Sequence, residues 1–137
     1  MLLDEAEARR RFAAARVARL ATADEHGRPH IVPVTFAVHG DMIVTAVDHK
    51  PKRSTNLKRL RNITVNPQVS LLVDHYDDDW TQLWWARADG SAHVLDHDPD
   101  AALWLRAEYR QYADTPPAGP TIHITVTSWS GWSSSFQ

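Results

Sequence analysis

The sequence predicts one mainly β domain, in which antiparallel strands form a barrel or curled sheet with helices inserted between them. Short segments rich in β-branched residues follow one another with tight turns between them, which favours an antiparallel sheet over a parallel α/β fold. The chain has 137 residues, a length that suits one domain with its own hydrophobic core. We therefore expect residues 1–137 to form a single domain.

The first third of the chain predicts one helix and three strands. The segment from Asp4 to about Ala15 is rich in the helix formers Ala, Glu and Arg, and Asp4 is placed as an N-cap. Three strands are expected at residues 17–23, 30–38 and 42–47. Tight turns between them predict an antiparallel meander. Pro33 predicts an edge or a bulge in the second strand, because proline cannot donate a hydrogen bond to a neighbouring strand.

The rest of the chain alternates helices and strands. Helices are expected at residues 54–65 and 98–112, and strands at 69–74, 80–95 and 121–129. The segment 80–95 is a strand pair or one bent strand, broken at Asp89-Gly90. The expected total is about six strands and three helices.

Composition and charge exclude several classes of protein. The chain has no cysteine, which excludes a disulfide scaffold, a thiolate metal site and a thiol nucleophile, and which suits the cytoplasm. Lys and Arg number 15 against 17 Asp and Glu, so a general binder of nucleic acid or acidic membranes is not expected. Neither a transmembrane run of about twenty apolar residues nor a signal peptide is found.

The segment joining the third strand to the second helix is the most informative part of the sequence. We call residues 48–57 the basic connector; it contains Lys50, Lys52, Arg53, Ser54 and Thr55. A hydroxyl that caps a helix, the free amides of the first turn and nearby cations together favour a bound phosphate. The alternative is a solvated basic loop. Nucleic-acid binding is not favoured, because aromatic residues are not interleaved with these cations.

The six tryptophans are many for a chain of this size. Trp80 follows an acidic run, where its ring is placed to cover a flat ligand. Trp84 and Trp85 are neighbours on an expected strand, so one should face the core and the other should face away from it. Trp129 and Trp132 lie in a polar C-terminal segment and pack either on a partner subunit or on their own chain.

Other catalytic and metal-binding motifs are not supported. The sequence has no nucleophile elbow, no Walker loop and no Gly-x-Gly-x-x-Gly turn. A zinc site built from His93, Asp96 and His97 is disfavoured, because these residues span a strand end and a loop. We expect no metal, and the sequence assigns no catalytic residue.

Several segments together resemble a known family. They are Arg16–Ala23, Gly27–Phe36, Lys50–Thr55, Asn66–Asp74, Trp80–Gly90 and the Trp-Ser-Gly-Trp segment near the C-terminus. The chain is similar over nearly its whole length to the flavin-type split-barrel proteins. More narrowly, it resembles the pyridoxamine-phosphate-oxidase-like group that uses the deazaflavin coenzyme F420. Relatives that use flavin mononucleotide (FMN) share the early motifs.

The resemblance implies a six-stranded antiparallel split β-barrel of the FMN-binding type, with helices inserted, that forms a homodimer with cofactor sites at its interface. The implied phosphate-binding residues are Lys50, Lys52, Arg53, Ser54 and Thr55. Pro33, Val34 and Thr35 are implied to line the ring system, and Trp80 to cover it. The second strand lacks the amide side chains found in close relatives, so recognition of the ring through backbone groups is expected.

The implied activity is that of an F420-dependent oxidoreductase that transfers a hydride to or from a small organic substrate. The cofactor carries the hydride chemistry, which fits the absence of an acid–base pair. The source of a substrate proton stays open between solvent, His30 and His49. The alternatives are an FMN-dependent enzyme of the same family and a non-catalytic protein that binds a cofactor or haem.

Overall fold

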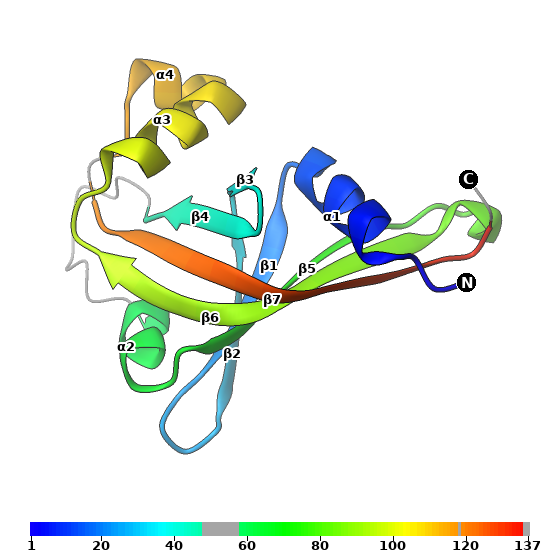
Figure 1. The fold of residues 1–137 in the computed structure, drawn as a ribbon, viewed down its shortest axis with the longest axis horizontal. Coiled ribbons are helices and arrows are strands. Elements are labelled where there is room, and N and C mark those ends of the chain that lie inside the picture. The colour runs from blue at the N-terminus through cyan, green and yellow to red at the C-terminus, as the bar shows by residue number, and fades with distance from the viewer. Residues whose placement is uncertain (48–57, 118, 136–137) are drawn as a thin grey trace.

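The structure, a computed structural model, describes residues 1–47, 58–117 and 119–135. In these residues seven strands form one sheet, in the order β2-β1-β5-β6-β7-β4-β3 (Figure 1). The strands are β1 (Ala18–Ala23), β2 (Pro29–Val34), β3 (Ala37–His39), β4 (Met42–Ala46), β5 (Gln68–His75), β6 (Trp84–Leu95) and β7 (Thr121–Ser133). The helices are α1 (Glu5–Ala14), α2 (Lys58–Val65), the short 3₁₀ helix η1 (Trp80–Gln82), α3 (Pro99–Glu108) and α4 (Arg110–Asp114). In the described ranges, no helix is both long enough and apolar enough to span a membrane.

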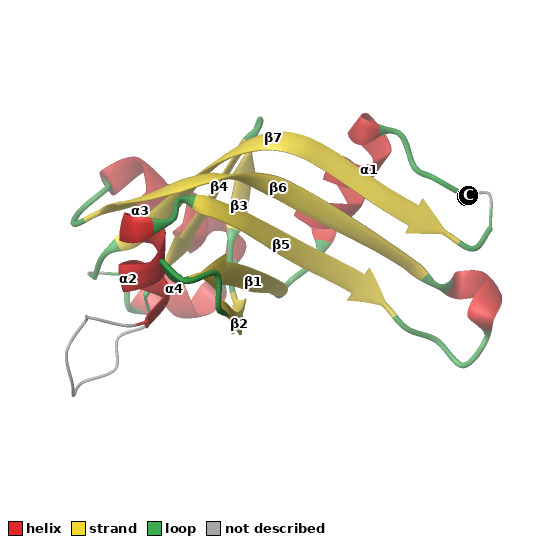
Figure 2. Cartoon of the chain, turned by 90° about the horizontal axis from the view of Figure 1, so that it is seen from below, coloured by secondary structure: helices red, strands yellow, loops and turns green. Residues whose placement is uncertain are grey.

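The sheet curls until its two edge strands meet. β2 and β3 are the outermost strands of the sheet, yet only Thr35 and Phe36 separate them in the chain. Such a link spans at most about 11 Å, so opposite edges of the sheet must come together around a core. Figure 2 shows β5, β6 and β7 side by side, with the other strands curled around one end of them. The predicted antiparallel split barrel is confirmed, with seven strands in place of six.

The additional strand arises from a break within the segment 30–38, which the sequence predicts to be one strand. The amide of Phe36 donates to the hydroxyl of Tyr109 at 2.9 Å, and this hydroxyl lies 2.9 Å from the Phe36 carbonyl. At Phe36 the backbone is therefore hydrogen-bonded to a side chain, where a neighbouring strand would otherwise supply the partner. The antiparallel pairings of the predicted meander are found, β1 with β2 and β3 with β4, but the predicted middle strand is divided, so the two pairs lie at opposite edges of the sheet. The prediction that Pro33 lies in an edge strand is confirmed.

The long strand β6 is continuous and irregular at Asp89/Gly90, where the sequence predicts a break. A Cβ atom at Gly90 would lie 2.2 Å from the carbonyl oxygen of Thr125, so glycine permits the close approach of β6 and β7. Trp84 packs against the main core, as the predicted alternation with Trp85 requires.

β7 continues to Ser133, beyond its predicted end at Trp129. Trp129 belongs to the core with 6% of its surface exposed, and its indole N–H donates to Asp41 at 2.9 Å. The sequence left open whether Trp129 packs on a partner subunit or on its own chain. In the structure it packs on its own chain. Trp132 is half-buried and lies opposite Trp85 in the β6–β7 pairing.

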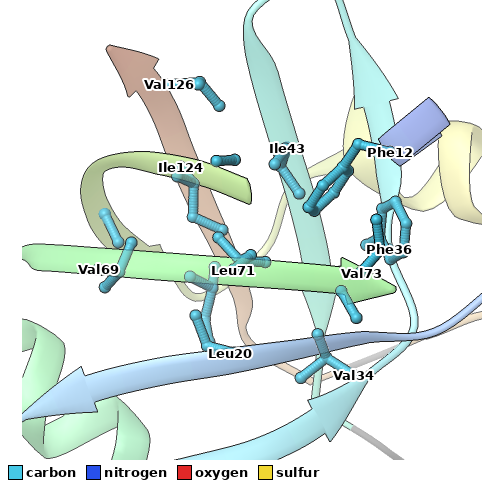
Figure 3. Packing of buried hydrophobic residues seen from close by; sticks show 14 of the residues in the cluster. Phe12, Leu20, Val34, Phe36, Ile43, Val69, Leu71, Val73, Ile124 and Val126 are labelled. Carbon is cyan, nitrogen blue, oxygen red and sulfur yellow. The ribbon is translucent and has the colours of Figure 1, made fainter. Parts of the chain in front are cut away.

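The main core fills the inside of the curled sheet and is closed by α1 (Figure 3). Phe12 on α1 is fully buried, and its ring lies 5.0 Å from that of Phe36 and 5.4 Å from that of Trp129, centroid to centroid. A second cluster forms where α3 and α4 cover β3 and β4. The predicted helix 98–112 is interrupted at Tyr109, whose backbone is extended.

α1 begins as predicted, because the Asp4 side chain accepts a hydrogen bond from the Glu7 amide at 2.8 Å. The Glu7 carboxylate in turn accepts hydrogen bonds from Arg10, at 2.6 and 2.8 Å, and from Arg11, at 2.7 Å. The bonds from Arg10 and then Arg11 lower the pKa of Glu7 from 4.5 to about 2. The charged form of Glu7 is therefore favoured in the folded protein.

Glu7→Gln is expected to make the free energy of unfolding depend less on pH at acidic pH. Because the pKa of Glu7 is lower in the folded state, its ionised form stabilises the fold above pH 4.5, and this contribution is lost as the pH falls towards 2. The variant should be less stable than the wild type at pH 7, and the difference should shrink between pH 5 and pH 3. Urea unfolding across this range measures it, with Glu25→Gln in the exposed 24–28 turn as control. A difference that stays constant with pH would contradict the prediction.

Candidate functional site

A surface hollow of about 150 Å³ lies where β2, β4 and α2 approach one another. It is lined by Val17, Pro33, Val34, Thr35, Ala46 and Arg59, and we call it the Thr35 hollow. Pro33, Val34 and Thr35 are the residues that the family resemblance assigns to a cofactor ring. The structure brings all three to this hollow, whose lining side chains are apolar apart from the Thr35 hydroxyl and the Arg59 guanidinium.

The basic connector, with Lys50, Lys52, Arg53, Ser54 and Thr55, lies outside the described residues. Its two neighbours in the chain are described. It joins Val47, which follows β4, to Lys58, the first residue of α2. Ala46 and Arg59, one residue further on each side, both line the Thr35 hollow. The described residues on either side of the basic connector therefore include two that line the hollow.

Hydrogen bonds hold Thr35 on two sides. The hydroxyl of Thr45 donates to the Thr35 carbonyl at 2.6 Å, and the Thr35 hydroxyl lies 3.1 Å from the hydroxyl of Tyr112. Tyr109 holds the next residue in the chain, Phe36, by its amide. Burial raises the pKa of Tyr109, so its hydroxyl keeps its proton at neutral pH. Both the carbonyl and the side chain of Thr35 are therefore hydrogen-bonded within the chain.

Trp80 is not part of the Thr35 hollow within one chain. It lies on η1 with 69% of its surface exposed, and its indole N–H donates weakly to the Tyr76 hydroxyl at 3.4 Å. The segment that carries it lies at the end of the molecule where the two chain termini lie, while α2 lies at the other end (Figure 1). A contact between Trp80 and a ligand in the Thr35 hollow would therefore require a second chain.

A larger hollow, of about 370 Å³, lies at the end of the molecule that carries η1. Its lining includes Arg10 and Arg11, which both bind Glu7, and Trp84, over which the Arg11 guanidinium lies at 5.5 Å. Its cations are thus already paired with a carboxylate. The Thr35 hollow remains the candidate site, because Ala46 and Arg59, which flank the basic connector in the chain, both line it.

Sequence reasoning missed Arg59, Tyr109 and Tyr112. Arg59 is one of several cations on α2, and its sequence context does not distinguish it from Lys58 and Arg61. Tyr109 and Tyr112 are three residues apart in a predicted helix, a spacing that indicates one shared face. That spacing is the available signal, but it does not say which strand the two hydroxyls meet.

Comparison with protein families decides the classification. Residues 4–133 match the family model described as pyridoxamine 5'-phosphate oxidase. The chain belongs to the pyridoxamine 5'-phosphate oxidase family. The Thr35 hollow and the basic connector both lie within the part of the chain that matches this family. A comparison with curated proteins found no match.

Solved structures share the fold of this family member over nearly its whole length. A flavin adenine dinucleotide (FAD)-binding protein of Mesorhizobium loti has a TM-score of 0.73 and 22% identity, covering 96% of this chain and 93% of its own. An FAD-binding protein of Mycobacterium smegmatis has a TM-score of 0.69 and 18% identity, covering 96% of each chain. The haem storage protein of Vibrio cholerae has a TM-score of 0.70 and 16% identity, covering 96% of this chain and 95% of its own. Identities this low show a shared fold.

Proposed function

We propose that this member of the pyridoxamine 5'-phosphate oxidase family is a cytoplasmic oxidoreductase that uses the deazaflavin coenzyme F420 to reduce or oxidise a small organic substrate. The observation that carries the proposal is that Ala46 and Arg59, which flank the basic connector in the chain, both line the Thr35 hollow. A site of this kind offers cations to a phosphate and, to a ring, apolar side chains together with polar groups. F420 carries both groups.

The phosphate of the cofactor is assigned to the basic connector. Lys50, Lys52 and Arg53 supply charge, and the hydroxyls of Ser54 and Thr55 supply directional hydrogen bonds. α2 adds further cations next to the connector in Lys58, Arg59 and Arg61, and residues 50–65 include no acid. This density of positive charge also suits the anionic glutamate tail of F420, which favours F420 over FMN.

The ring is assigned to the Thr35 hollow. Bound F420 supplies the hydride chemistry through its ring. The side chains of Pro33 and Val34 exclude water from one face, and the Thr35 hydroxyl offers a hydrogen bond. Backbone groups of β2 supply the remaining polar contacts, because this strand has no amide side chains next to the hollow. His30, on β2, and His49, in the basic connector, remain unassigned as proton donors.

We further propose that the functional unit is a homodimer with its cofactor sites at the interface. The Thr35 hollow holds about 150 Å³, whereas ligand pockets usually hold about 300–1,000 Å³, so one chain supplies only part of the wall. Trp80 of a second copy is a candidate for the missing cover. Ile31, 64% exposed on β2, and Leu72, 37% exposed on β5, give the sheet an apolar surface for such a partner.

Two alternatives have support from the fold comparisons. Two similar structures are FAD-binding proteins, which favours a flavin in the same site. Another is a haem storage protein, which favours a non-catalytic binding role. FMN also remains an alternative, because FMN-dependent relatives share the early sequence motifs.

Titration of the purified protein with F420, FMN, FAD and haem is expected to show the tightest binding for F420, with one cofactor per chain. The measurement is quenching of intrinsic tryptophan or cofactor fluorescence, with absorbance for haem. Reduced F420 mixed with quinone-like or unsaturated acceptors should then be oxidised faster with the protein than without it.

Each other outcome selects a different function. Tight binding of FMN or FAD with no response to F420 would replace the proposal with a flavin-dependent enzyme. Saturable haem binding without oxidation of reduced F420 would favour the storage role. Size-exclusion chromatography with light scattering tests the dimer, and a monomer in the presence of cofactor would overturn that part of the proposal.

A further inference from the structure

The helix pair α3–α4 meets the wall of the Thr35 hollow through two tyrosine hydroxyls. Tyr109, at the junction of the two helices, is 7% exposed. Its hydroxyl accepts from the Phe36 amide at 2.9 Å and lies near two carbonyl oxygens, those of Arg16 at 3.0 Å and Phe36 at 2.9 Å. A phenol has one proton and donates to one of them at a time. Because Arg16 precedes Val17 and Phe36 follows Thr35, Tyr109 holds the neighbours of two residues that line the hollow.

Tyr112 reaches the hollow more directly. Its hydroxyl lies 3.1 Å from the Thr35 hydroxyl, and the Thr35 carbonyl is held separately by Thr45 at 2.6 Å. A threonine hydroxyl has one proton and two lone pairs. Either hydroxyl can be the donor in this contact, so the bond to Tyr112 restrains the Thr35 side chain and leaves part of its hydrogen-bonding capacity for a ligand in the hollow.

The two helices are anchored by contacts that do not involve these hydroxyls. The Trp104 ring stacks on His39 of β3 at 4.3 Å, with an angle of 6° between the planes. Asp98 caps α3 and also bonds to His123 of β7. Leu105 is fully buried against β3 and β4. Removing a tyrosine hydroxyl should therefore leave the helices in place.

We propose that Tyr112 is a positioning residue for the cofactor ring, which acts through the Thr35 hydroxyl, and that Tyr109 holds the Thr35–Phe36 link on which this positioning depends. The inference rests on the proposed function, because it assigns the Thr35 hollow to the ring. The Thr35 hydroxyl, in the link that follows β2, would then supply the polar side chain that β2 itself lacks next to the hollow.

The test is a double-mutant cycle with Tyr112→Phe, Thr35→Val and the two changes combined. Each single variant is expected to bind F420 about tenfold more weakly, and the double variant no more weakly than Thr35→Val alone. Affinity for inorganic phosphate, measured by competition, should be unchanged in all three. This second readout separates loss of ring positioning from a general loss of structure.

Thr127→Val is the matched control. The Thr127 hydroxyl is exposed and donates to the Asp89 carbonyl at 3.1 Å, where the β6–β7 pairing is irregular. The change therefore removes one hydroxyl hydrogen bond at a place away from the hollow. It should leave F420 affinity unchanged. An equal loss of affinity in Thr127→Val and Tyr112→Phe would overturn the positioning role.

Tyr109→Phe tests the link itself in protein without cofactor. The Phe36 amide loses its acceptor, so its hydrogen exchange should become at least about tenfold faster, while exchange at Leu20 in β1 stays the same. Exchange followed by nuclear magnetic resonance measures both amides. Unchanged exchange at Phe36 would overturn the role of Tyr109.

The remaining outcomes distinguish this inference from the proposed function. If the wild type binds F420 and Tyr112→Phe binds it equally well, the inference is wrong and the proposed function stands. Additive losses in the cycle would mean that Tyr112 does not act through Thr35, and would also overturn it. A wild type that binds neither F420 nor a flavin would overturn the proposed function, and the ring-positioning role with it.

Discussion

Replacing Lys52 and Arg53 together with alanine is expected to weaken F420 binding about a hundredfold or more. Hydrogen bonds to charged groups contribute about 1.5–3 kcal/mol each. The loss of two at the lower end of this range costs about 3 kcal/mol, which corresponds to about a hundredfold in affinity. The affinity of the variant should also depend less on salt, because fewer charges meet the phosphate. Fluorescence titration at two ionic strengths measures both effects.

The control for this prediction removes the same charge elsewhere. Arg28→Ala combined with Arg106→Ala changes two exposed arginines, one in the turn before β2 and one on α3. This pair should bind F420 as the wild type does. Equal losses in the two double variants would indicate an effect of net charge alone, and unchanged affinity in the Lys52 and Arg53 variant would show that the connector does not bind the phosphate.

Phe12→Ala is expected to lower the free energy of unfolding by about 3–5 kcal/mol. The Phe12 side chain is fully buried, and its ring contacts those of Phe36 and Trp129. Its removal leaves a cavity between α1 and the inside of the curled sheet. Alanine is the better helix former, so the loss cannot come from the helix itself. Urea unfolding followed by tryptophan fluorescence measures the change.

Phe12→Leu separates lost volume from lost aromatic contact. It keeps most of the buried surface and should cost clearly less than the alanine change, because the remaining cavity is smaller. Folded domains are typically stable by about 5–15 kcal/mol, so the alanine variant should unfold at a much lower urea concentration. A cost below about 1 kcal/mol would contradict the assignment of α1 to the core.

Elements defined by neighbouring residues were predictable from the sequence. Asp4 and Asp98 cap the helices that follow them, because a short acceptor side chain meets free amides two or three residues later. Gly27 and Gly40 occupy the predicted turns with φ of 80° and 62°, values that favour glycine. The alternation of apolar residues along β5 likewise specifies a strand.

Features that depend on distant parts of the chain were not predictable. The break between β2 and β3 follows from the bond between Phe36 and Tyr109, 73 residues apart, and the order at Thr35 follows from Tyr112, 77 residues away. The stretch around Phe36 is β-branched and apolar, so local preference alone favours one continuous strand. Trp129 shows the same limit, since its polar neighbours suggest exposure while Phe12 and Asp41 bury it.

Two parts of the candidate site were predictable from the sequence. Pro33, Val34 and Thr35 are consecutive residues, so they lie close together in any fold. The phosphate site was predicted because cations in the connector stand directly before an expected helix start. The sequence by itself determined the mainly β class, the capped helices and the turns, because each depends on interactions within a few residues. Tertiary structure alone decided that the edges of the sheet meet at Thr35–Phe36, that Trp80 lies far from the hollow, and that two tyrosines hold its wall. Those features depend on packing between segments that are far apart in the sequence, and local sequence patterns do not indicate which segments will meet.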